Sequence, residues 1–250
     1  MSYALYDDLA GLRTWRQNEL ALRRRIRDTI VERVETTARD INRAWTFEEV
    51  EAPLMMPLER MSSAYTSDDV FMLRDAPGGT KEWAMRAETT DGTYCAAVQI
   101  LRTTSVKAPL CVWQMGTSFR RELNDGATAA RLRFNAFTQL ELQMVHYADT
   151  AADIAVPIRE ALVPLVGRLT GLETRLVASD RLPSYATETI DIECRLPNVP
   201  ESASEDARWR EVASTSRRTD FPTPPGYKPL KVFEIAFGMD RLVALANGTL

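Results

Sequence analysis

Apolar residues recur along the chain with two different periods, which predict helices in some segments and strands in others. Over residues 14–44 they return every three or four positions, with Arg and Glu between them, as on the buried face of an amphipathic helix. Residues 46–52 read as a strand, and Pro53 ends it, because proline has no N–H to give to a neighbouring strand. A long helix leading into an edge strand is therefore expected.

Shorter elements fill the rest of the chain. Helices are predicted over 90–101, 153–169 and 238–246, and strands over 69–74, 82–86, 110–116, 117–123, 137–145, 172–179, 191–196, 209–216 and 232–236. Turn or loop segments are predicted at 76–79, 124–126, 198–207 and the proline-rich 222–229. There is no internal repeat, and strands do not alternate regularly with helices. The sequence thus predicts an α+β fold, a mostly antiparallel β-sheet flanked by helices.

The first helix and strand allow two interpretations. An exposed helix beside an edge strand is a natural seam for a dimer. The same apolar stripe also fits a helix packed on its own sheet. The periodicity favours neither.

Length and composition narrow the class of protein. With 250 residues, 45% hydrophobic and 26% charged, the chain fits one large folded domain, and no apolar run approaches the roughly 20 residues of a membrane span. The first eight residues do not resemble a secretory signal, so an intracellular, cytoplasmic protein without a membrane partner is expected.

The charge balance argues against a surface devoted to coating nucleic acid. The net charge is −4 and the pI is about 5.3, although a local basic patch remains compatible with these values. Only four of the 31 basic residues are lysines, and arginine suits bidentate contacts to phosphate and carboxylate. Genome base composition explains that bias equally well.

The cysteines indicate neither a disulfide framework nor a zinc site. Cys95, Cys111 and Cys194 lie far apart, with no CxxC pair and only His146 as an imidazole ligand. We expect three buried, small apolar side chains.

Phosphate-binding backbone motifs are absent, since the chain holds neither GxxxxGK[ST] nor GxGxxG. Side chains must therefore bind any phosphate. Arg86 with Glu88, and Arg120 with Glu122, are spaced to share one face of a strand, and Glu234 precedes Arg241 at the last strand-to-helix junction.

Four segments in order resemble the class II aminoacyl-tRNA synthetases. Residues 116–122 read Gly-Thr-Ser-Phe-Arg-Arg-Glu and, with 133–141, are similar to the second signature of that class, FRxE followed by RxxxF. Residues 233–242 resemble the third signature, a strand and a helix with Gly-x-x-Arg, and 14–53 resemble the first. Residues 85–90 look like the loop that holds the substrate amino group.

The resemblance implies one class II synthetase-like catalytic domain over 1–250. Its parts would be a dimer-forming helix and strand (13–57), the FRxE motif with the following strand (116–145) and the C-terminal Gly-x-x-Arg motif (231–250). We expect no anticodon-binding domain. Within the class, segments 185–193 and 209–221 look most like glycyl-tRNA synthetase.

The resemblance also implies roles for particular residues. Arg120 and Arg241 would be catalytic, neutralising ATP phosphates, and Glu211 would hold Mg²⁺. The expected ATP-binding residues are Arg120, Arg121, Glu122, Leu132, Arg133, Phe137, Glu211, Val212, Gly238 and Arg241. The expected amino-acid-binding residues are Arg86, Glu88, Phe137, Gln139, Glu141, Glu234, Ala236 and Gly238.

The expected activity is ATP-dependent formation of an aminoacyl-adenylate from glycine or another small amino acid, with acyl transfer to a tRNA or a carrier protein, by a homodimer that uses ATP and Mg²⁺ but no zinc. One departure from the glycyl pattern is Glu234-Ile235-Ala236, where those enzymes usually carry Glu-Pro-Ser, which leaves the amino acid open. Two alternatives remain, a non-catalytic, dimeric accessory protein that acts through binding and one chain of a split enzyme.

Overall fold

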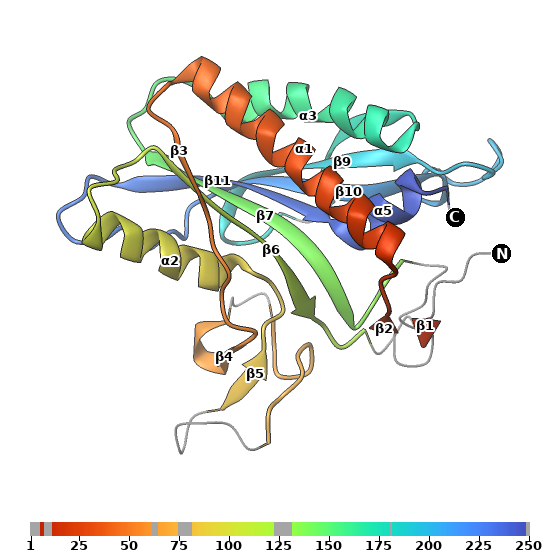
Figure 1. The fold of residues 1–250 in the computed structure, drawn as a ribbon, viewed down its shortest axis with the longest axis horizontal. Coiled ribbons are helices and arrows are strands. Elements are labelled where there is room, and N and C mark those ends of the chain that lie inside the picture. Colours follow the sequence, from red (N-terminus) through yellow and green to blue (C-terminus); the bar gives the residue numbers. More distant parts are fainter. Residues whose placement is uncertain are drawn as a thin grey trace.

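Seven strands form the central sheet of the molecule, in the order β3-β6-β7-β11-β10-β9-β8 (Figure 1). The computed structural model describes residues 6–7, 12–61, 65–74, 82–122, 132–180 and 182–248. The strands are β3 (Thr46–Glu49), β6 (Leu110–Phe119), β7 (Ala136–Tyr147), β8 (Thr174–Ala178), β9 (Ala186–Arg195), β10 (Trp209–Arg218) and β11 (Leu230–Gly238). All neighbours are antiparallel except β3 and β6, which are parallel. The predicted fold class is confirmed.

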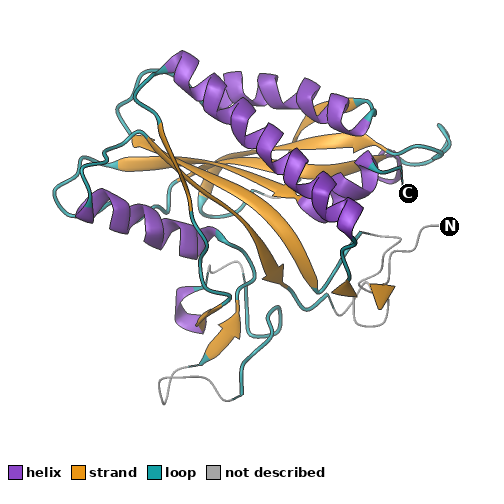
Figure 2. Ribbon diagram, viewed as in Figure 1, coloured by secondary structure: helices purple, strands orange, loops and turns teal. Residues whose placement is uncertain are grey.

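Helices cover the two faces of the sheet unequally (Figure 2). Helices α1 (Gln17–Ile41), α3 (Ala155–Thr170) and α5 (Met239–Ala246) lie on one face, and α2 (Thr90–Thr103) lies on the other. The main core fills the three-helix side, where Met144, Ile235 and Phe237 point from the central strands. Since side chains alternate along a strand, the neighbouring positions face α2.

The long first helix packs on its own sheet. Ile26, Ile30, Val34 and Ala38 are fully buried in the core shared with the central strands. Of the two interpretations of this helix, packing on its own sheet therefore accounts for the apolar stripe.

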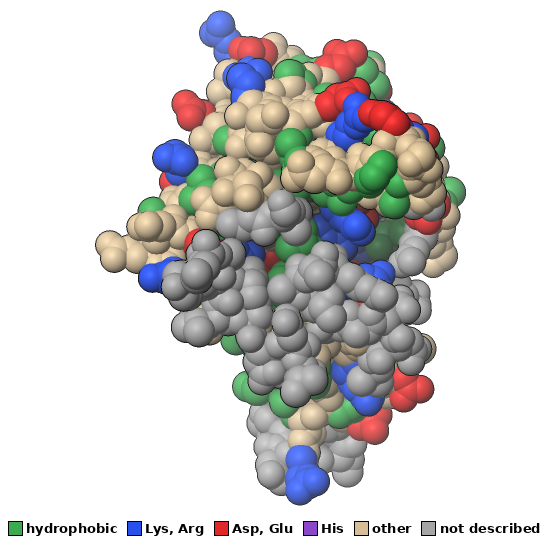
Figure 3. All heavy atoms as spheres, turned by 90° about the vertical axis from the view of Figure 1, so that its right-hand side faces the viewer, with side chains coloured by type: hydrophobic (Ala, Val, Ile, Leu, Met, Phe, Trp, Pro, Cys, Tyr) green, Lys and Arg blue, Asp and Glu red, His purple; other side chains and the backbone are tan. Residues whose placement is uncertain are grey.

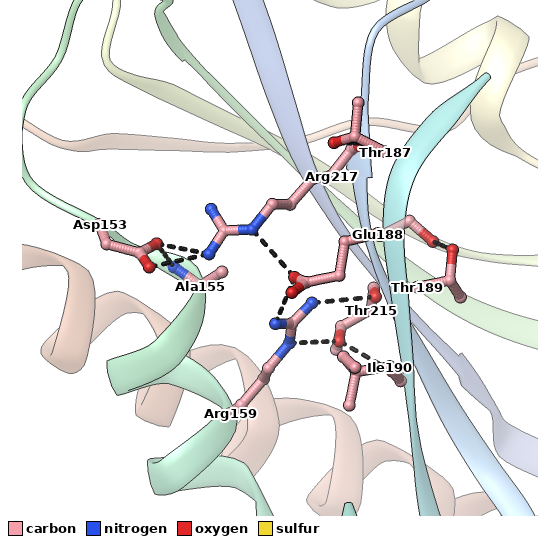
Figure 4. A network of polar contacts seen from close by, with 10 residues as sticks. Asp153, Ala155, Arg159, Thr187, Glu188, Thr189, Ile190, Thr215 and Arg217 are labelled. Atoms are coloured by element: carbon pink, nitrogen blue, oxygen red, sulfur yellow. Dashed lines mark hydrogen bonds and ion pairs between the residues drawn. The ribbon is translucent and has the colours of Figure 1, made fainter. Parts of the chain in front are cut away.

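A chain of charged groups fixes the start of α3 to the sheet (Figure 4). Arg159 on α3 donates to Glu188 on β9 at 2.6 Å and to the hydroxyl of Thr215 on β10 at 2.8 Å. Arg217 joins the same Glu188 to Asp153, whose carboxylate also accepts the main-chain N–H of Ala155. Three elements are thus held together by alternating charges.

Small elements complete the described structure. The strand β4 (Met55–Pro57) pairs with β5 (Trp83–Met85), and β1 (Tyr6–Asp7) pairs with β2 (Leu12–Arg13). A single 3₁₀ turn follows β4 at Leu58–Arg60, and a four-residue helix, α4 (Glu205–Arg208), precedes β10. The β4–β5 pair lies on the same side of the sheet as α2, at the bottom of Figure 1.

Several predicted elements need correction. The segment 69–74 is not a regular strand: a turn covers 67–69, and the next residues make one isolated bridge, Met72 to Ala84, with main-chain hydrogen bonds from Leu73 to Trp83 and from Met85 to Phe71. The strands predicted at 110–116 and 117–123 are one strand that ends at Phe119, and the predicted loop 198–207 runs into α4. The predicted turns at 76–79 and 124–126 lie outside the described residues.

The cysteine prediction is wrong in one case. Cys111 and Cys194 are buried and all three thiols are free, but Cys95 is exposed because it lies on the outer side of α2. No helix in the described part of the chain is long and apolar enough to cross a membrane.

Candidate active site

Polar side chains cross the sheet in rows on the face that carries α2. The strand register places Gln143, Glu234, Ser216 and Thr189 side by side on β7, β11, β10 and β9. The next row holds Gln114, Glu141, Ala236, Ser214 and Asp191. A third row is Gly116, Gln139 and Gly238. Carboxylates thus flank a strip of small residues, an arrangement that a purely structural sheet face does not need.

Two glutamates lie at the centre of these rows, under the first turn of α2. The Thr89 hydroxyl donates to Oε2 of Glu141, and the Thr90 hydroxyl lies within hydrogen-bond distance of both Glu141 (3.2 Å) and Glu234 (3.3 Å). Gln143 donates to Glu234 at 2.7 Å. These donors hold both carboxylates in fixed positions at the start of the helix.

Arg218 compensates part of this buried negative charge. Its Nη1 donates to Oε2 of Glu234 at 2.8 Å, and its other nitrogens form two hydrogen bonds to Asp220 at 3.0 and 2.6 Å. The guanidinium also lies 3.9 Å from the ring centre of Tyr185. Burial alone would lower the pKa of Arg218, but Glu234 and Asp220 outweigh it, so the pKa is raised and the charge is permanent.

A third carboxylate completes an acidic group of three. Glu88 lies just before α2, where Tyr65 hydrogen-bonds to it. Burial raises the pKa of Glu88, and Glu234 raises it further, against the opposing effect of Arg218. For Glu141, burial together with Glu234 and Glu88 raises the pKa to about 7. Three carboxylates so close together favour a positively charged partner.

Arg86 stabilises the main chain beside the site through hydrogen bonds. It is almost fully buried, and it donates to the main-chain carbonyls of Thr117 and Ala52, each at 2.8 Å, and to Gln114 at 3.2 Å. Because β5 ends at Met85, Arg86 and Glu88 do not share a strand face, which corrects the prediction from their spacing. Arg86 instead ties the end of β3 to β6.

Arg120 lies beside the acidic group at the end of β6. Its Nε donates to the carbonyl of Ala87 at 3.0 Å, and its guanidinium lies 5.0 Å from the ring centre of Phe137 and 5.1 Å from that of Tyr65. Burial works against its charge, but Tyr65 and Glu88 outweigh that effect and its pKa is raised. Arg120 and Glu122 follow the strand, which ends at Phe119, so they too are not on a strand face as predicted.

Arg241 approaches the same region from the first turn of α5. It donates to the carbonyl of Glu211 at 3.1 Å and to that of Leu132 at 3.5 Å, and its Nη1 lies 3.7 Å from the Glu211 carboxylate. Burial lowers its pKa, Glu211 opposes this, and the nearby cations Arg210, Arg133 and Arg120 lower it further. Arg241, Arg210, Arg133 and Arg120 therefore bring positive charge together beside Glu122 and Glu211, a concentration of arginines that suits an anionic ligand.

Comparison with known proteins decides the fold. A seryl-tRNA synthetase of M. kandleri, solved with a tRNA of A. aeolicus, superimposes on 97% of this chain with a TM-score of 0.71 and 19% identity. The prolyl-tRNA synthetase of Cryptosporidium parvum, solved with halofuginone and AMPPNP, also covers 97% of it with a TM-score of 0.73 and 13% identity. The chain has the catalytic-core fold of class II aminoacyl-tRNA synthetases. It covers 54% and 48% of those two chains.

Sequence similarity points to one branch of this class II fold. The chain is 27% identical over 144 residues to the glycine–tRNA ligase of Alkaliphilus metalliredigens, and 29% identical over 143 residues to that of Alkaliphilus oremlandii. Each alignment covers 55% of this chain and 28% of the relative, so the chain spans under a third of those relatives' length. No protein-family model matches the chain.

The remaining predicted residues lie around the acidic group and the arginines near Arg241. Glu122 forms an ion pair with Arg133 at 3.5 Å. Leu132 is buried with a left-handed backbone, φ 50°, and turns its carbonyl to Arg241. Val212 points into the core, so only its carbonyl lies near Gly238. Arg121 donates its main-chain N–H to Asp69.

The charges of this candidate site suit a nucleotide polyphosphate, and a Mg²⁺ ion would have few protein ligands here. Glu211, on β10, is the carboxylate expected to hold Mg²⁺, and Asp191 lies on the neighbouring strand β9, where burial raises its pKa and Glu211 raises it further. In the described ranges no group of three or more His, Cys, Asp or Glu side chains is placed to hold a metal. One or two carboxylates, completed by phosphate oxygens and water, are usual for Mg²⁺.

Sequence reasoning placed Thr89 and Thr90 in the loop expected to hold the amino group but did not list them as site residues, and it missed Arg218, Gln143 and Tyr185. An available signal was Arg218 with Asp220, two residues apart directly after a predicted strand. The face of the molecule seen in Figure 3 carries basic and acidic side chains in mixed positions, and among the described residues drawn there no large area of one sign appears.

Proposed function

We propose that this protein activates a small amino acid with ATP, forming an aminoacyl-adenylate, and then passes the acyl group to an acceptor. The observation that carries the proposal is the contact between two oppositely charged groups on one sheet face. Glu88, Glu141 and Glu234 form an acidic group, and Arg120 lies between it and the arginines around Arg241. An amino acid and a nucleotide polyphosphate present the matching charges.

The acidic group would anchor the ammonium group of the amino acid. The carboxylate of the bound amino acid then attacks the α-phosphorus of ATP. A new O–P bond forms, and pyrophosphate leaves with the electrons of the broken P–O bond. No general base is required, because the nucleophile is already ionised. Arg120 and Arg241 stabilise the charge that develops on the phosphates, and Mg²⁺ held by Glu211 supplies further positive charge when bound.

Two features support a compact amino acid. Ala236 lies between Glu141 and Ser214 in the strand register, and Gly116 and Gly238 flank Gln139 in the next row. Thr90, Gln143 and Arg218 fill the space around Glu234 with fixed polar groups. Glycine is the first candidate, because the relatives are glycine–tRNA ligases. Ala236 in place of serine makes alanine and serine the next candidates.

The proposed acceptor is a tRNA, as in the seryl enzyme solved with one, and a carrier protein is the second candidate acceptor. The proposed assembly is a cytoplasmic homodimer formed through residues 13–57. Light scattering that gives about twice 28.2 kDa at micromolar concentration supports the dimer, and a monomer mass contradicts it.

The decisive test is ATP–pyrophosphate exchange with single amino acids, beginning with glycine, alanine, serine, threonine and proline. Exchange with one of them establishes the adenylate and names the amino acid. Absence of exchange with all of them, in protein that is folded by circular dichroism, contradicts the enzymatic proposal. Calorimetry with ATP then distinguishes two explanations. Absence of ATP binding indicates an accessory protein, which does not need the arginines, whereas ATP binding indicates an enzyme that lacks a partner chain.

A further inference from the structure

A buried ion pair links the segment before α1 to the first turn of α5. Arg13 donates from Nη1 to the main-chain carbonyl of Asp240 at 3.1 Å, and the same nitrogen lies 3.7 Å from the Asp240 carboxylate. The two side chains are 1% and 4% exposed, and Arg13 also pairs with Glu19. The guanidinium groups of Arg13 and Arg23 both contact the ring of Trp15, at 3.9 and 4.6 Å from its centre. So many buried charges need a reason beyond packing.

The Asp240 carboxylate binds the main chain of β7 just beyond the last residue pair between β7 and β11. The last pair between β11 and β7 is Gly238 with Gln139, so Thr138 lies one residue beyond it. Oδ2 of Asp240 accepts the main-chain N–H of Thr138 at 2.6 Å. Arg23 on α1 donates to the hydroxyl of the same threonine at 3.2 Å. On the side of β11, the start of β7 is thereby fixed to α5 by a side chain, while its other side stays paired with β6.

This contact lies next to two residues with expected roles. Thr138 follows Phe137, which Arg120 contacts, and Asp240 precedes Arg241, which approaches Glu211 and Leu132. We infer that Asp240, held by Arg13 and Arg23, is a positioning residue that sets the spacing between Phe137 and Arg241 and so the affinity of the site for ATP. The inference rests on the proposed function, because it takes ATP as the ligand between these residues.

Charge makes this contact sensitive to pH. The groups that face the Asp240 carboxylate are Arg13 from the segment before α1, Arg23 from α1, the main chain of Thr138 from β7 and the first turn of α5 itself. Burial raises the pKa of Asp240 to about 6, while these partners oppose the rise. Below that pH the carboxyl is protonated and its attraction for Arg13 and for the Thr138 N–H weakens.

The test compares Asp240→Asn with Asp153→Asn. Asp153 is a matched control, since it too accepts a main-chain N–H at a helix start and pairs with an arginine (Figure 4), and its partners Ala155 and Arg217 are not among the expected nucleotide residues. The dissociation constant for ATP is measured by calorimetry from pH 5 to 8. In the parent protein the affinity for ATP should fall below pH 6. In Asp240→Asn the affinity for ATP should be about tenfold weaker and nearly independent of pH. Asp153→Asn should show the same pH profile as the parent protein. Equal pH profiles in parent and Asp240→Asn would overturn the inference.

A second variant keeps the test usable if Asp240→Asn does not fold. Arg13→Gln leaves the carboxylate in place and removes a cation that lowers its pKa, so the loss of ATP affinity should begin at a higher pH than in the parent protein. An unshifted profile contradicts the inference.

Hydrogen exchange separates this inference from the proposed function. Without nucleotide, the Thr138 amide should be less protected below pH 6 than above it in the parent protein, and its protection should be reduced at every pH in Asp240→Asn, whose side-chain oxygen still accepts the N–H but carries no charge. If the parent does not bind ATP, the proposed function fails, and unchanged Thr138 protection in Asp240→Asn would overturn the positioning contact itself.

Discussion

Arg218 and Glu234 form an ion pair that is almost completely buried, with 2.8 Å between Nη1 and Oε2 and side chains only 2% and 10% exposed. Glu234 is among the site residues expected from the sequence, whereas Arg218 is assigned to the site by its contacts in the fold. The pair joins β10 to β11 at the centre of the proposed amino-acid site.

Replacing Arg218 with methionine should destabilise the protein by about 3–5 kcal/mol, because Glu234 is left buried without its cation. Urea denaturation measures the change. Lys228→Ala is the matched control, since its ion pair with Asp149 has a similar length, 3.2 Å, but exposed side chains, and it should cost about 0–1 kcal/mol. Equal effects of the two substitutions would show that burial of the Arg218 pair does not matter.

Glu141 should make both stability and ligand binding depend on pH. Its folded-state pKa is raised from 4.5 to about 7, so the protonated form is favoured in the fold, and its stabilising contribution is complete below about 4.5 and lost as the pH rises through 7. Glu141→Gln should flatten the unfolding free energy of the protein over this interval.

Binding should follow the opposite trend, because an ammonium group needs the ionised carboxylate. The KM for the amino acid in pyrophosphate exchange should fall as the pH rises from 6 to 8, and Glu141→Gln should abolish that trend. A pH-independent KM in the parent protein would contradict a contact between Glu141 and the amino group.

Gly116→Ala should destabilise the protein by about 1–3 kcal/mol, since a Cβ there would overlap Nη2 of Arg86. Arg86 has little freedom to move, because its other nitrogens bind the carbonyls of Ala52 and Thr117. Gly238→Ala is the control for folding, as its Cβ would meet only ordinary contacts at 3.9 Å. Thermal unfolding of both variants decides the matter, and a Gly116→Ala protein as stable as the parent would show that Arg86 does move.

Arg120→Ala should slow pyrophosphate exchange by about 10²–10³-fold, the usual loss when one fixed donor to a developing charge is removed. The control is Arg175→Ala, which removes an arginine that pairs with Glu193 and Glu205 at the far edge of the sheet and should leave exchange unchanged. An Arg120→Ala enzyme with normal exchange would remove this residue from the mechanism.

Local signals in the sequence predicted much of the fold. The helix periodicity before Ala44 and the strand around Glu141 are confirmed, and the similarity to class II enzymes gave the fold from the segments around Arg120 and Arg241. The roles of individual residues remain proposals.

Contacts between distant parts of the chain were not predictable from local patterns. Arg13 and Asp240 are 227 positions apart, and Arg218 meets Glu141's neighbours only because β10, β11 and β7 lie side by side. The segment 69–74 has the composition of a strand, but it begins in the turn at Thr66 and Asp69 and pairs with β5 only around Met72.

The parallel pairing of β3 with β6 has a consequence for how ligand preference can change. A parallel pair cannot be joined by a tight turn, so the chain between Glu49 and Leu110 must travel away from the sheet and return. That excursion supplies Glu88, Thr89 and Thr90 to the site, whereas the strand pairing is made elsewhere. Changes in Glu88, Thr89 and Thr90 would therefore alter which ligand is held without changing any strand partner in the seven-stranded sheet, provided that Arg86 and the buried face of α2, which contact the sheet, are kept.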